Sequence, residues 1–424
     1  MTLVRARVMD TPDDPFAGGV LRHDEDAGLL VADGVIAARG PYAELRAAHP
    51  DEEVLDLRGG VMLPGFVDTH VHFPQVRVIG SLGLPLLEWL DRCALPEECR
   101  LAEAAYAEVI AREFVDGLVG AGTTSALVFG SHFAPAVDVL LREVSRVGLR
   151  VTAGLVVSDR GLPDALLTTP ERAYDESRAL ARRWHGTGRV RYAVTPRFSY
   201  STTEATLDAC AAVLEDEPGT WFTSHVNENP DEVTAVGELF ADALHYVGTY
   251  DAHGLVGERS VLAHNVHATD DELKLLAGRG AAVAHCATSN SALGSGLFPL
   301  RRHVEHGVRV ALGSDVGAGT GFSLLKEGLQ ASFMQALLGA EGVPLTPAHL
   351  LFLATRAGAL ALGLDVGDLG EGRPFDAVWI CPEDGDPLDV GLRHAASAEA
   401  ALSKVFALGT PADVAGVWVA GERL

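Results

Sequence analysis

Apolar residues follow two alternating patterns along this chain from about residue 63 onward. Short apolar runs typical of strands are followed by longer stretches in which apolar residues recur at helical spacing, as in Ala102–Val119, Pro170–Trp184 and Asp270–Gly278. Eight runs predict strands: Gly65–His72, Thr123–Gly130, Arg150–Ser158, Val190–Phe198, Thr220–Glu228, Ser260–His267, Ala281–Asn290 and Val308–Val316. Eight β-α repeats close most naturally into a (β/α)8 TIM barrel with a parallel sheet. We therefore predict an α/β fold with this barrel at residues 63–368.

The two ends of the chain show a different pattern. Residues 1–62 predict short strands separated by turns at residues 32–34 and 58–60, with helical spacing only at Tyr42–Ala48. Residues 369–424 predict further short strands, at Arg373–Ile380, Ala401–Leu408 and Ala415–Val419. We expect these two ends to join in one small β-sandwich domain beside the barrel.

Polar residues with metal-binding chemistry stand at the carboxyl ends of several predicted strands. His70 and His72 are two positions apart, so their side chains leave the same face of a strand. His225, His264 and Asp315 end later strands, and barrel enzymes build their sites at these ends. Each histidine taken alone could be a structural residue, and Asp315 alone could belong to a turn. Together they predict a zinc or iron site.

Glu228 is the best candidate for a general acid or base. It comes three residues after His225, where the predicted strand has ended, so its carboxylate can approach a water activated by the metal. The alternative is a glutamate that merely favours the start of the helix that follows.

The connection after the first barrel strand, residues 74–100, is unusually long, and such loops often shape or cover a site. Its segment Leu86–Leu90 predicts an amphipathic turn over the mouth of the barrel. Trp89 could then form a wall of the substrate pocket, or the turn could have no contact with substrate.

Charge and composition narrow the class of partner. A formal net charge of −25 and a pI near 4.9 would repel nucleic acids and anionic membranes, so we expect a small-molecule partner. No run of 18 apolar residues and no apolar leader occurs, which predicts a soluble, cytosolic protein. The five cysteines form no C-x-x-C pair, so we expect reduced thiols instead of disulfides or a cysteine zinc cluster.

Several motifs resemble those of a known family. PGFVDTHVH, SHVNEN, LAHNVH and LGSDVGAG resemble the amidohydrolase superfamily, metal-dependent hydrolases on a distorted TIM barrel. PQV, LPLLEWL, TPRFS and AHCATSNSALGSGLFPL are similar to the guanine deaminase family within it. The resemblance implies hydrolytic deamination of guanine to xanthine and ammonia, and a homodimer. The alternatives are a deaminase of a related aminated heterocycle (8-oxoguanine, a pterin or an s-triazine) and a non-catalytic barrel protein.

The resemblance also implies roles for individual residues. The ligands of one divalent ion, zinc or else iron, would be His70, His72, His225 and Asp315, and His264 would contact the water on that ion. Asp315 would also take a proton from this water. The purine would be held by Gln75, Arg197 and Phe198, although these could also be a loop glutamine, a surface arginine and a core phenylalanine.

A second metal is not expected. Superfamily members with two metals bridge them through a lysine on strand four, and the three lysines here, Lys274, Lys326 and Lys404, all lie elsewhere. Two positions depart from the usual family pattern, Asn265 after the histidine and Ser314 before the aspartate, but neither is an implied ligand. The other zinc deaminase architecture, H-x-E with P-C-x-x-C, is matched only by His303–Glu305 and lacks the cysteine pair.

Overall fold

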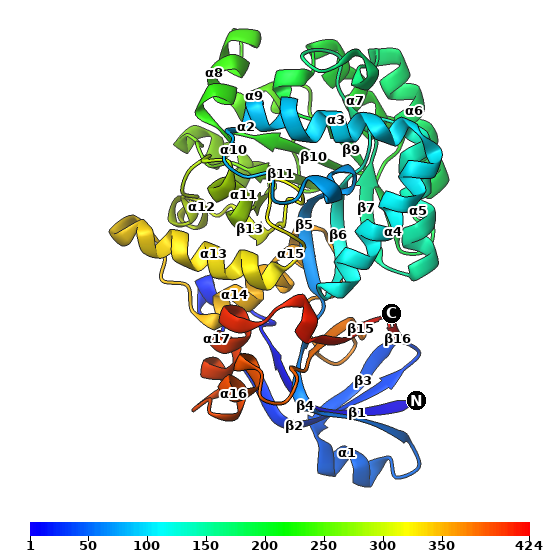
Figure 1. Cartoon of the computed structure of the whole chain (residues 1–424), viewed down its shortest axis with the longest axis vertical. Coiled ribbons are helices and arrows are strands. Elements are labelled where there is room, and N and C mark those ends of the chain that lie inside the picture. The colour runs from blue at the N-terminus through cyan, green and yellow to red at the C-terminus, as the bar shows by residue number, and fades with distance from the viewer.

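The computed structural model describes all 424 residues, which form a barrel and a smaller sheet beside it (Figure 1). The barrel strands are all parallel and neighbour one another in chain order: β5 (Phe66–His72), β6 (Thr123–Phe129), β7 (Arg150–Gly154), β9 (Val190–Pro196), β10 (Trp221–Val226), β11 (Ser260–His264), β12 (Ala282–His285) and β13 (Arg309–Leu312). The two-residue strand β8 (Val156–Val157) extends β7 and pairs with β9. The predicted TIM barrel is confirmed.

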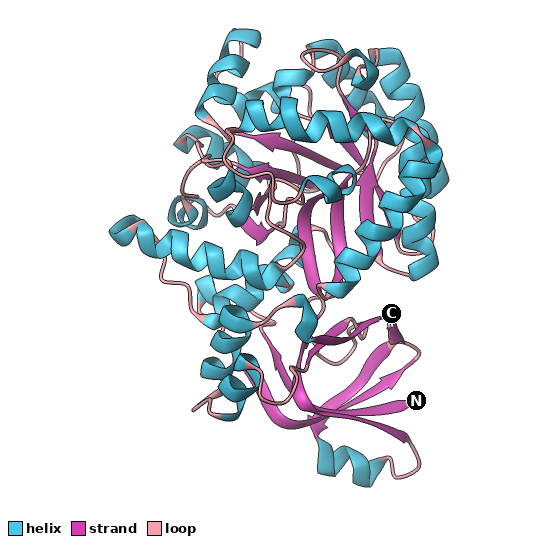
Figure 2. Ribbon diagram, in the orientation of Figure 1, coloured by secondary structure: helices cyan, strands magenta, loops and turns pink.

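Helices surround this sheet (Figure 2). They are α4 (Ala104–Gly120), α5 (Ala134–Val147), α6 (Pro170–Trp184), α7 (Glu204–Asp216), α8 (Pro230–Leu239), α9 (Tyr246–Asp251), α10 (Asp270–Arg279), α11 (Ala287–Ala292), α12 (Leu300–Glu305), α13 (Leu324–Leu337), α14 (Pro347–Ala354) and α15 (Arg356–Ala361). Short 3₁₀ turns occur at Pro15–Ala17, Phe73–Val78, Arg100–Ala102, Asp164–Leu166, Ser199–Ser201, Gly339–Glu341 and Pro411–Asp413. The apolar faces of the helices and the outer face of the barrel share one large core, which fixes the sheet that carries the site.

A separate apolar cluster of the barrel holds mainly small side chains. Ala193, Ala263, Ala282 and Ala284 belong to it with Trp221, and residues of α15 join the same cluster. The polar side chains that line the pocket belong to residues at or just after the carboxyl ends of the strands.

A buried carboxylate closes the seam between the first and last barrel strands. Asp68 on β5 accepts hydrogen bonds from the backbone N–H and the hydroxyl of Ser314, at 3.0 and 2.5 Å. Beside them the N–H of Asp315 donates to the carbonyl oxygen of His70 at 2.8 Å. Gly313 permits this approach, because a Cβ there would lie 2.8 Å from the Cβ of His70. The seam thus sets Asp315 against His70.

The two chain ends combine in a single seven-stranded sheet, in the order β16 (Glu422–Arg423), β15 (Val414–Val419), β14 (Ala377–Ile380), β4 (Glu53–Pro64), β1 (Thr2–Asp10), β2 (Arg22–Ala32) and β3 (Val35–Pro41). Figure 1 shows both termini at this sheet. Helices α1 (Tyr42–Ala48), α16 (Pro387–Arg393) and α17 (Ala398–Leu408) belong to the same two chain ends. The expected union of the chain ends is confirmed, in the form of one sheet instead of the two facing sheets of a β-sandwich.

Asp10 ties the two ends together. Its fully buried carboxylate accepts from Arg22 at 2.5 Å, from Arg39 at 3.0 Å and from the backbone N–H of Leu369 at 2.8 Å. Since Leu369 begins the C-terminal segment, one carboxylate joins the N-terminal strands β2 and β3 to that segment.

One predicted strand near the C-terminus is wrong. Ala401–Leu408 is part of helix α17, whose amino end is capped by the Ser397 side chain. Its buried residues are Ala398, Ala401, Leu402, Val405 and Phe406. Their spacing of three and four is that of a helix, and this periodicity overrides the strand-like context of the flanking segments.

Other predicted elements differ mainly at their ends. The predicted strand Ala281–Asn290 is wrong in its second half, since β12 ends at His285 and α11 begins at Ala287. Strand β14 covers only the second half of Arg373–Ile380. The predicted helix at Pro170–Trp184 has the bounds of α6, with Thr169 as its N-cap and Pro170 in its first turn.

All five cysteines are free thiols, as predicted. No helix in the structure combines the length and apolar character needed to cross a membrane.

Candidate active site

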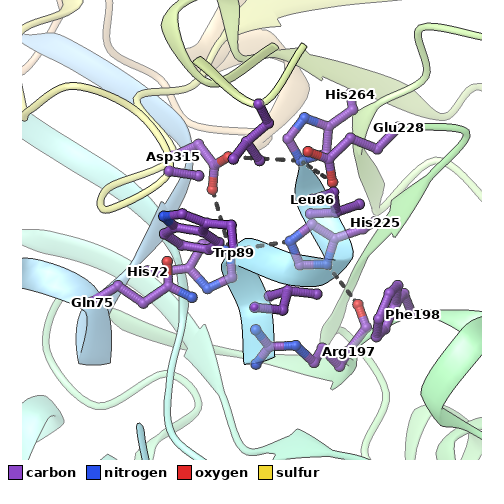
Figure 3. A pocket seen from close by; sticks show the side chains of 13 residues that line it. His72, Gln75, Leu86, Trp89, Arg197, Phe198, His225, Glu228, His264 and Asp315 are labelled. Carbon is purple, nitrogen blue, oxygen red and sulfur yellow. Dashed lines mark hydrogen bonds and ion pairs between the residues drawn. The ribbon is translucent and has the colours of Figure 1, made fainter. Parts of the chain in front are cut away.

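A pocket opens at the carboxyl ends of the barrel strands and holds about 340 Å³ of space not filled by atoms (Figure 3). Its lining comes from the ends of several strands and from the long segment after β5: His72, Gln75, Leu86, Trp89, Leu90, Arg197, Phe198, His225, Glu228, His264, Leu293, Asp315 and Ala318. His70 lies directly behind it, fully buried. The structure therefore brings together every residue that the sequence nominated for the site.

Imidazoles and a carboxylate converge on one point in this pocket. Nε2 of His70 and Nε2 of His72 each lie 3.3 Å from Oδ1 of Asp315, and Nε2 of His72 lies 3.1 Å from Nε2 of His225. One potential ligand atom from each of four residues, His70, His225, His264 and Asp315, lies within 4.8 Å of all the others. A single divalent cation can reach all of these atoms.

The proton on His225 is fixed by its neighbour. Its Nδ1 lies 2.6 Å from the carbonyl oxygen of Arg197, and a carbonyl can only accept. Nδ1 therefore carries the proton, and Nε2 presents its lone pair to the convergence point. Such a backbone partner is typical of metal-ligating histidines.

Several residues at these strand ends adopt left-handed backbone conformations. The φ angles are 49° at Asn227, 71° at His264 and 48° at Asp315. Non-glycine residues rarely adopt this conformation, and functional sites are where it is retained. At His264 and Asp315 this conformation accompanies a side chain that lines the pocket.

Burial keeps the imidazoles neutral. It lowers the pKa of His72 to about 3, and burial together with the neighbouring imidazoles lowers the pKa of His225 well below its ordinary value. Burial alone would raise the pKa of Asp315, but the imidazoles of His70 and His264 lower it well below its ordinary value. Neutral imidazoles beside an ionised carboxylate are the protonation states that metal ligands need.

Glu228 lies beside His264, with 3.5 Å between Oε2 of the glutamate and Nε2 of the histidine. Helix α8 begins only at Pro230, and its capping box is made by Asn229 and Glu232. Glu232 accepts from the backbone N–H of Glu228 at 3.0 Å, so it serves the helix terminus and leaves the carboxyl of Glu228 facing the pocket. Burial and the nearby carboxylates of Asp315 and Glu232 raise the pKa of Glu228 well above its ordinary value.

The imidazole of His264 is oriented by a hydrogen bond to Asn290. Its Nδ1 lies 3.0 Å from Oδ1 of Asn290, which leaves Nε2 facing Glu228 and Asp315. Figure 3 shows His264 and Glu228 together on one side of the pocket.

The opposite wall is polar at two positions and apolar at the others. Arg197 lies next to Phe198, and Gln75 lies at the left of the view near Trp89, both away from Glu228 (Figure 3). Trp89 is 2% exposed and lines the pocket with Leu86 and Leu90. A flat ring that offers hydrogen-bond acceptors along one edge fits between such walls.

The long segment after β5 covers the mouth of the barrel, as its length predicted. It is made of α2 (Leu86–Trp89), a π-helical turn at Leu90–Ala94 and α3 (Leu95–Cys99). Its apolar residues form a separate cluster with Phe198, Leu293 and Ala318, so the cover packs on the pocket walls.

Two buried carboxylates near the site were missed by the sequence reasoning. Asp68 closes the seam, and Glu98 accepts from Gln75 at 2.8 Å and from Arg197 at 2.6 Å. A helical-spacing signal existed for Glu98, because it follows the buried Leu90 and Ala94 at intervals of four and so shares their face. For Asp68 the available signal was a charged residue inside an otherwise apolar strand, since a buried carboxylate there needs hydrogen-bond partners.

Comparison with known proteins identifies the family. The model of the amidohydrolase family matches residues 61–424, and that of the bacterial imidazolonepropionase-like composite domain matches residues 27–51. A probable guanine deaminase from Deinococcus radiodurans is 60% identical over 429 residues, covering 99% of this chain and 98% of its own. The structure of E. coli guanine deaminase superposes with a TM-score of 0.96 at 35% identity, covering 100% of this chain and 99% of that chain.

A further structure carries a ligand. The crystal structure of guanine deaminase from C. acetobutylicum, with guanine bound in the active site, superposes with a TM-score of 0.92 at 25% identity, covering 100% of this chain and 99% of that chain. With the family model matching most of the chain and relatives of high identity along nearly its whole length, the chain belongs to the amidohydrolase family and, within it, to the guanine deaminase family.

Proposed function

We propose that this chain is a metal-dependent guanine deaminase, which adds water to the amino-bearing carbon of guanine, releases ammonia and leaves xanthine. The observation that carries the proposal is the convergence of the imidazoles of His70, His72 and His225 on the carboxylate of Asp315, with Glu228 in the same pocket. The names of the similar proteins, one with guanine bound, support the choice of substrate.

The residues fit a divalent ion. Both ring nitrogens of His70 and Nε2 of His264 are buried and have no hydrogen-bond partner in the protein, an arrangement that is costly unless a ligand completes it. We assign His70, His72, His225 and Asp315 as ligands of one ion. Three nitrogens and one oxygen with a position left for water suit zinc, and iron also accepts this donor set.

One ion per chain is consistent with strand four of the barrel. Strand β9 offers no lysine that could bridge a second metal. A bound divalent ion supplies hydroxide near neutrality by lowering the pKa of a coordinated water to about 7.

Glu228 and Asp315 would move the protons. Asp315 accepts a proton from the attacking water, and Glu228, whose pKa is raised by burial and the nearby carboxylates, donates one to the ring nitrogen beside the attacked carbon. Nε2 of His264 faces both carboxyls and steadies the oxygen that adds to the ring. The proton taken up by Asp315 then passes to the amino group, the bond from carbon to that group breaks to release ammonia, and the hydroxyl of the adduct returns a proton to Glu228. Water and guanine thus give xanthine and ammonia, and both carboxyls end as they began.

Substrate orientation would come from the opposite wall. The guanidinium of Arg197 donates to the carbonyl oxygen of guanine, Gln75 bonds the ring edge, and Phe198 packs against the ring with Trp89 closing the pocket. Zinc as the metal, a homodimer, a cytosolic location and a part in purine catabolism stay predictions.

An ultraviolet assay tests the proposal. Purified protein of known metal content is incubated with guanine, with and without a chelator, and xanthine is followed by its absorbance. Xanthine formation that the chelator abolishes supports the proposal. Intact guanine in the presence of stoichiometric metal would refute guanine as substrate, and other aminated heterocycles would then be screened.

A metal measurement on His70→Ala tests the ligand set separately. We expect this variant to lose the ion, whereas retained stoichiometric metal would contradict the assignment of His70.

A further inference from the structure

Glu98 lies behind the pocket wall and does not line the pocket, yet it contacts both polar residues of that wall. Its side chain is about 3% exposed. Oε1 accepts from Nε2 of Gln75 at 2.8 Å, and Oε2 accepts from Nη1 of Arg197 at 2.6 Å. Nδ1 of His132 lies 3.3 Å from the same Oε2. One carboxylate thus joins residues from the long segment after β5, the turn after β9 and the loop after β6.

The carboxylate of Glu98 is ionised and can only accept. Burial alone would raise its pKa, but the guanidinium of Arg197 and the imidazole of His132 hold the pKa well below its ordinary value. Because an ionised carboxylate carries no proton, every partner of Glu98 must turn a donor toward it.

This fixes the direction of the Gln75 amide from two sides. Its Nε2 donates to Glu98, and its Oε1 accepts from the backbone N–H of Gly317 at 3.3 Å. An amide turned the other way would place oxygen against oxygen at Glu98 and N–H against N–H at Gly317. The group left for the pocket is therefore the second N–H of Nε2.

Arg197 also has only donors to offer. One of its N–H groups is used by Glu98, and no other side chain of the protein accepts from the remaining ones. Every N–H that Gln75 and Arg197 still have free is a donor, and the one acceptor atom on these two side chains, Oε1 of Gln75, is held at the N–H of Gly317. The wall therefore presents donors.

Such a wall distinguishes purines by the group at position 6. A 6-oxopurine presents two neighbouring acceptors, O6 and N7, whereas a 6-aminopurine presents a donor beside the N7 acceptor. A donor facing another donor leaves both unpaired, which costs affinity.

We propose that Glu98 is a positioning residue that keeps the Gln75 amide and the Arg197 guanidinium turned as donors, and so makes the site select 6-oxopurines over 6-aminopurines. The proposal rests on the proposed function, since it concerns the same site and the guanine that it would bind.

The variant Glu98→Gln tests it with little change of shape. If the amide oxygen at position 98 accepts from Arg197, the amide N–H₂ at position 98 faces Gln75. The Gln75 amide must then turn its oxygen toward position 98, and the second lone pair of that oxygen becomes an acceptor on the pocket side. We measure kcat and KM for guanine, and the inhibition constant of 2,6-diaminopurine, in which an amino group replaces O6. We expect KM for guanine to rise about 10- to 100-fold, and kcat to fall by a smaller factor. The selectivity ratio, which is the inhibition constant of 2,6-diaminopurine divided by KM for guanine, should fall at least about tenfold.

Glu97→Gln is the matched control. Glu97 is the preceding residue on α3, is also largely buried and accepts from Arg100 at 3.0 Å and from the hydroxyl of Tyr106, outside the pocket. We expect KM and the selectivity ratio of this variant to stay within about twofold of the wild-type values, because a change of helix charge alone does not turn the wall.

A double variant covers the case in which Glu98→Gln does not fold. Gln75→Glu combined with Glu98→Gln keeps the net charge and the bond between positions 75 and 98, but turns acceptors toward the pocket. We expect 2,6-diaminopurine to bind more tightly relative to guanine than in the wild type.

The outcomes separate the two proposals. If the wild type deaminates guanine but the selectivity ratio is unchanged in the folded variants, the role of Glu98 is refuted and the proposed function stands. If kcat falls with an unchanged KM and ratio, Glu98 is only structural and the inference is again refuted. If the wild type leaves guanine intact, the proposed function fails, and the inference fails with it.

Discussion

Asp68 offers the sharpest test of how the fold builds the metal site. It is fully buried and accepts from the backbone N–H of His70 at 3.1 Å, and from the backbone N–H and the hydroxyl of Ser314 at 3.0 and 2.5 Å. Asp68→Ala leaves the two backbone donors buried without an acceptor. Each such donor costs about 1–3 kcal/mol, so the free energy of unfolding should fall by about 2–6 kcal/mol.

Asp68→Asn is the matched comparison. The amide oxygen can still accept from both backbone donors, and the amide N–H₂ can donate to the Ser314 hydroxyl, so only the assistance of the charge is lost. We expect this variant to lose about 1–2 kcal/mol.

The same change should reach the metal. Because Asp68 sets the register in which Asp315 meets His70, Asp68→Ala should weaken metal binding about 10- to 100-fold, as substitutions behind metal ligands commonly do. Urea unfolding followed by tryptophan fluorescence gives the stability change, and competition with a chelator gives the metal affinity. An alanine variant that unfolds within about 1 kcal/mol of the wild type and holds its metal equally well would refute the reasoning.

Three further predictions concern catalysis, the pocket wall and the small sheet. Glu228→Gln should keep its metal but lose about 10²- to 10⁴-fold in kcat, and full activity at normal metal content would contradict its role in proton transfer. Trp89→Ala should raise KM for guanine about tenfold or more, because it removes a buried pocket wall; an unchanged KM in a steady-state assay would show that the wall does not touch the substrate. Asp10→Asn should lower the free energy of unfolding by about 2–4 kcal/mol at pH 7, because Arg22 and Arg39 lose a buried charged partner. These arginines lower the pKa of Asp10 in the folded state, so the stability that Asp10 contributes is present above its unfolded pKa of about 4 and is lost as the pH falls further. The difference in unfolding free energy between variant and wild type should therefore shrink at pH 3. An equal difference at pH 7 and pH 3 would argue against this pairing.

The elements that carry the site could be predicted because their signals are local. The spacing of His70 and His72 is set by the two-residue period of a strand, and the position of His225 at a strand end follows from where an apolar run stops. The histidine and carboxylate positions also match family motifs, so the chemistry could be inferred without a structure.

What escaped prediction depends on contacts between distant residues. Asp68 and Ser314 are 246 positions apart, and Glu98 and Arg197 are 99 apart, so no local pattern shows that they meet. The misassigned strand at Ala401–Leu408 is different, since its buried residues do have helical spacing and the error came from the character of the flanking strands.

Arg197 contacts both His225 of the histidine cluster and Glu98 behind the pocket wall. Its carbonyl oxygen accepts from Nδ1 of His225 and so leaves Nε2 of that imidazole facing the His/Asp cluster, while its guanidinium pairs with Glu98 behind the pocket wall. The carbonyl belongs to the backbone just after β9, whereas the guanidinium is held by the segment that covers the barrel mouth. Displacement of that cover would release the Glu98 contact but leave the backbone contact to His225 in place. The His/Asp cluster is therefore built by the barrel itself, whereas the wall proposed to bind the purine is completed by Glu98 of α3, which belongs to the covering segment.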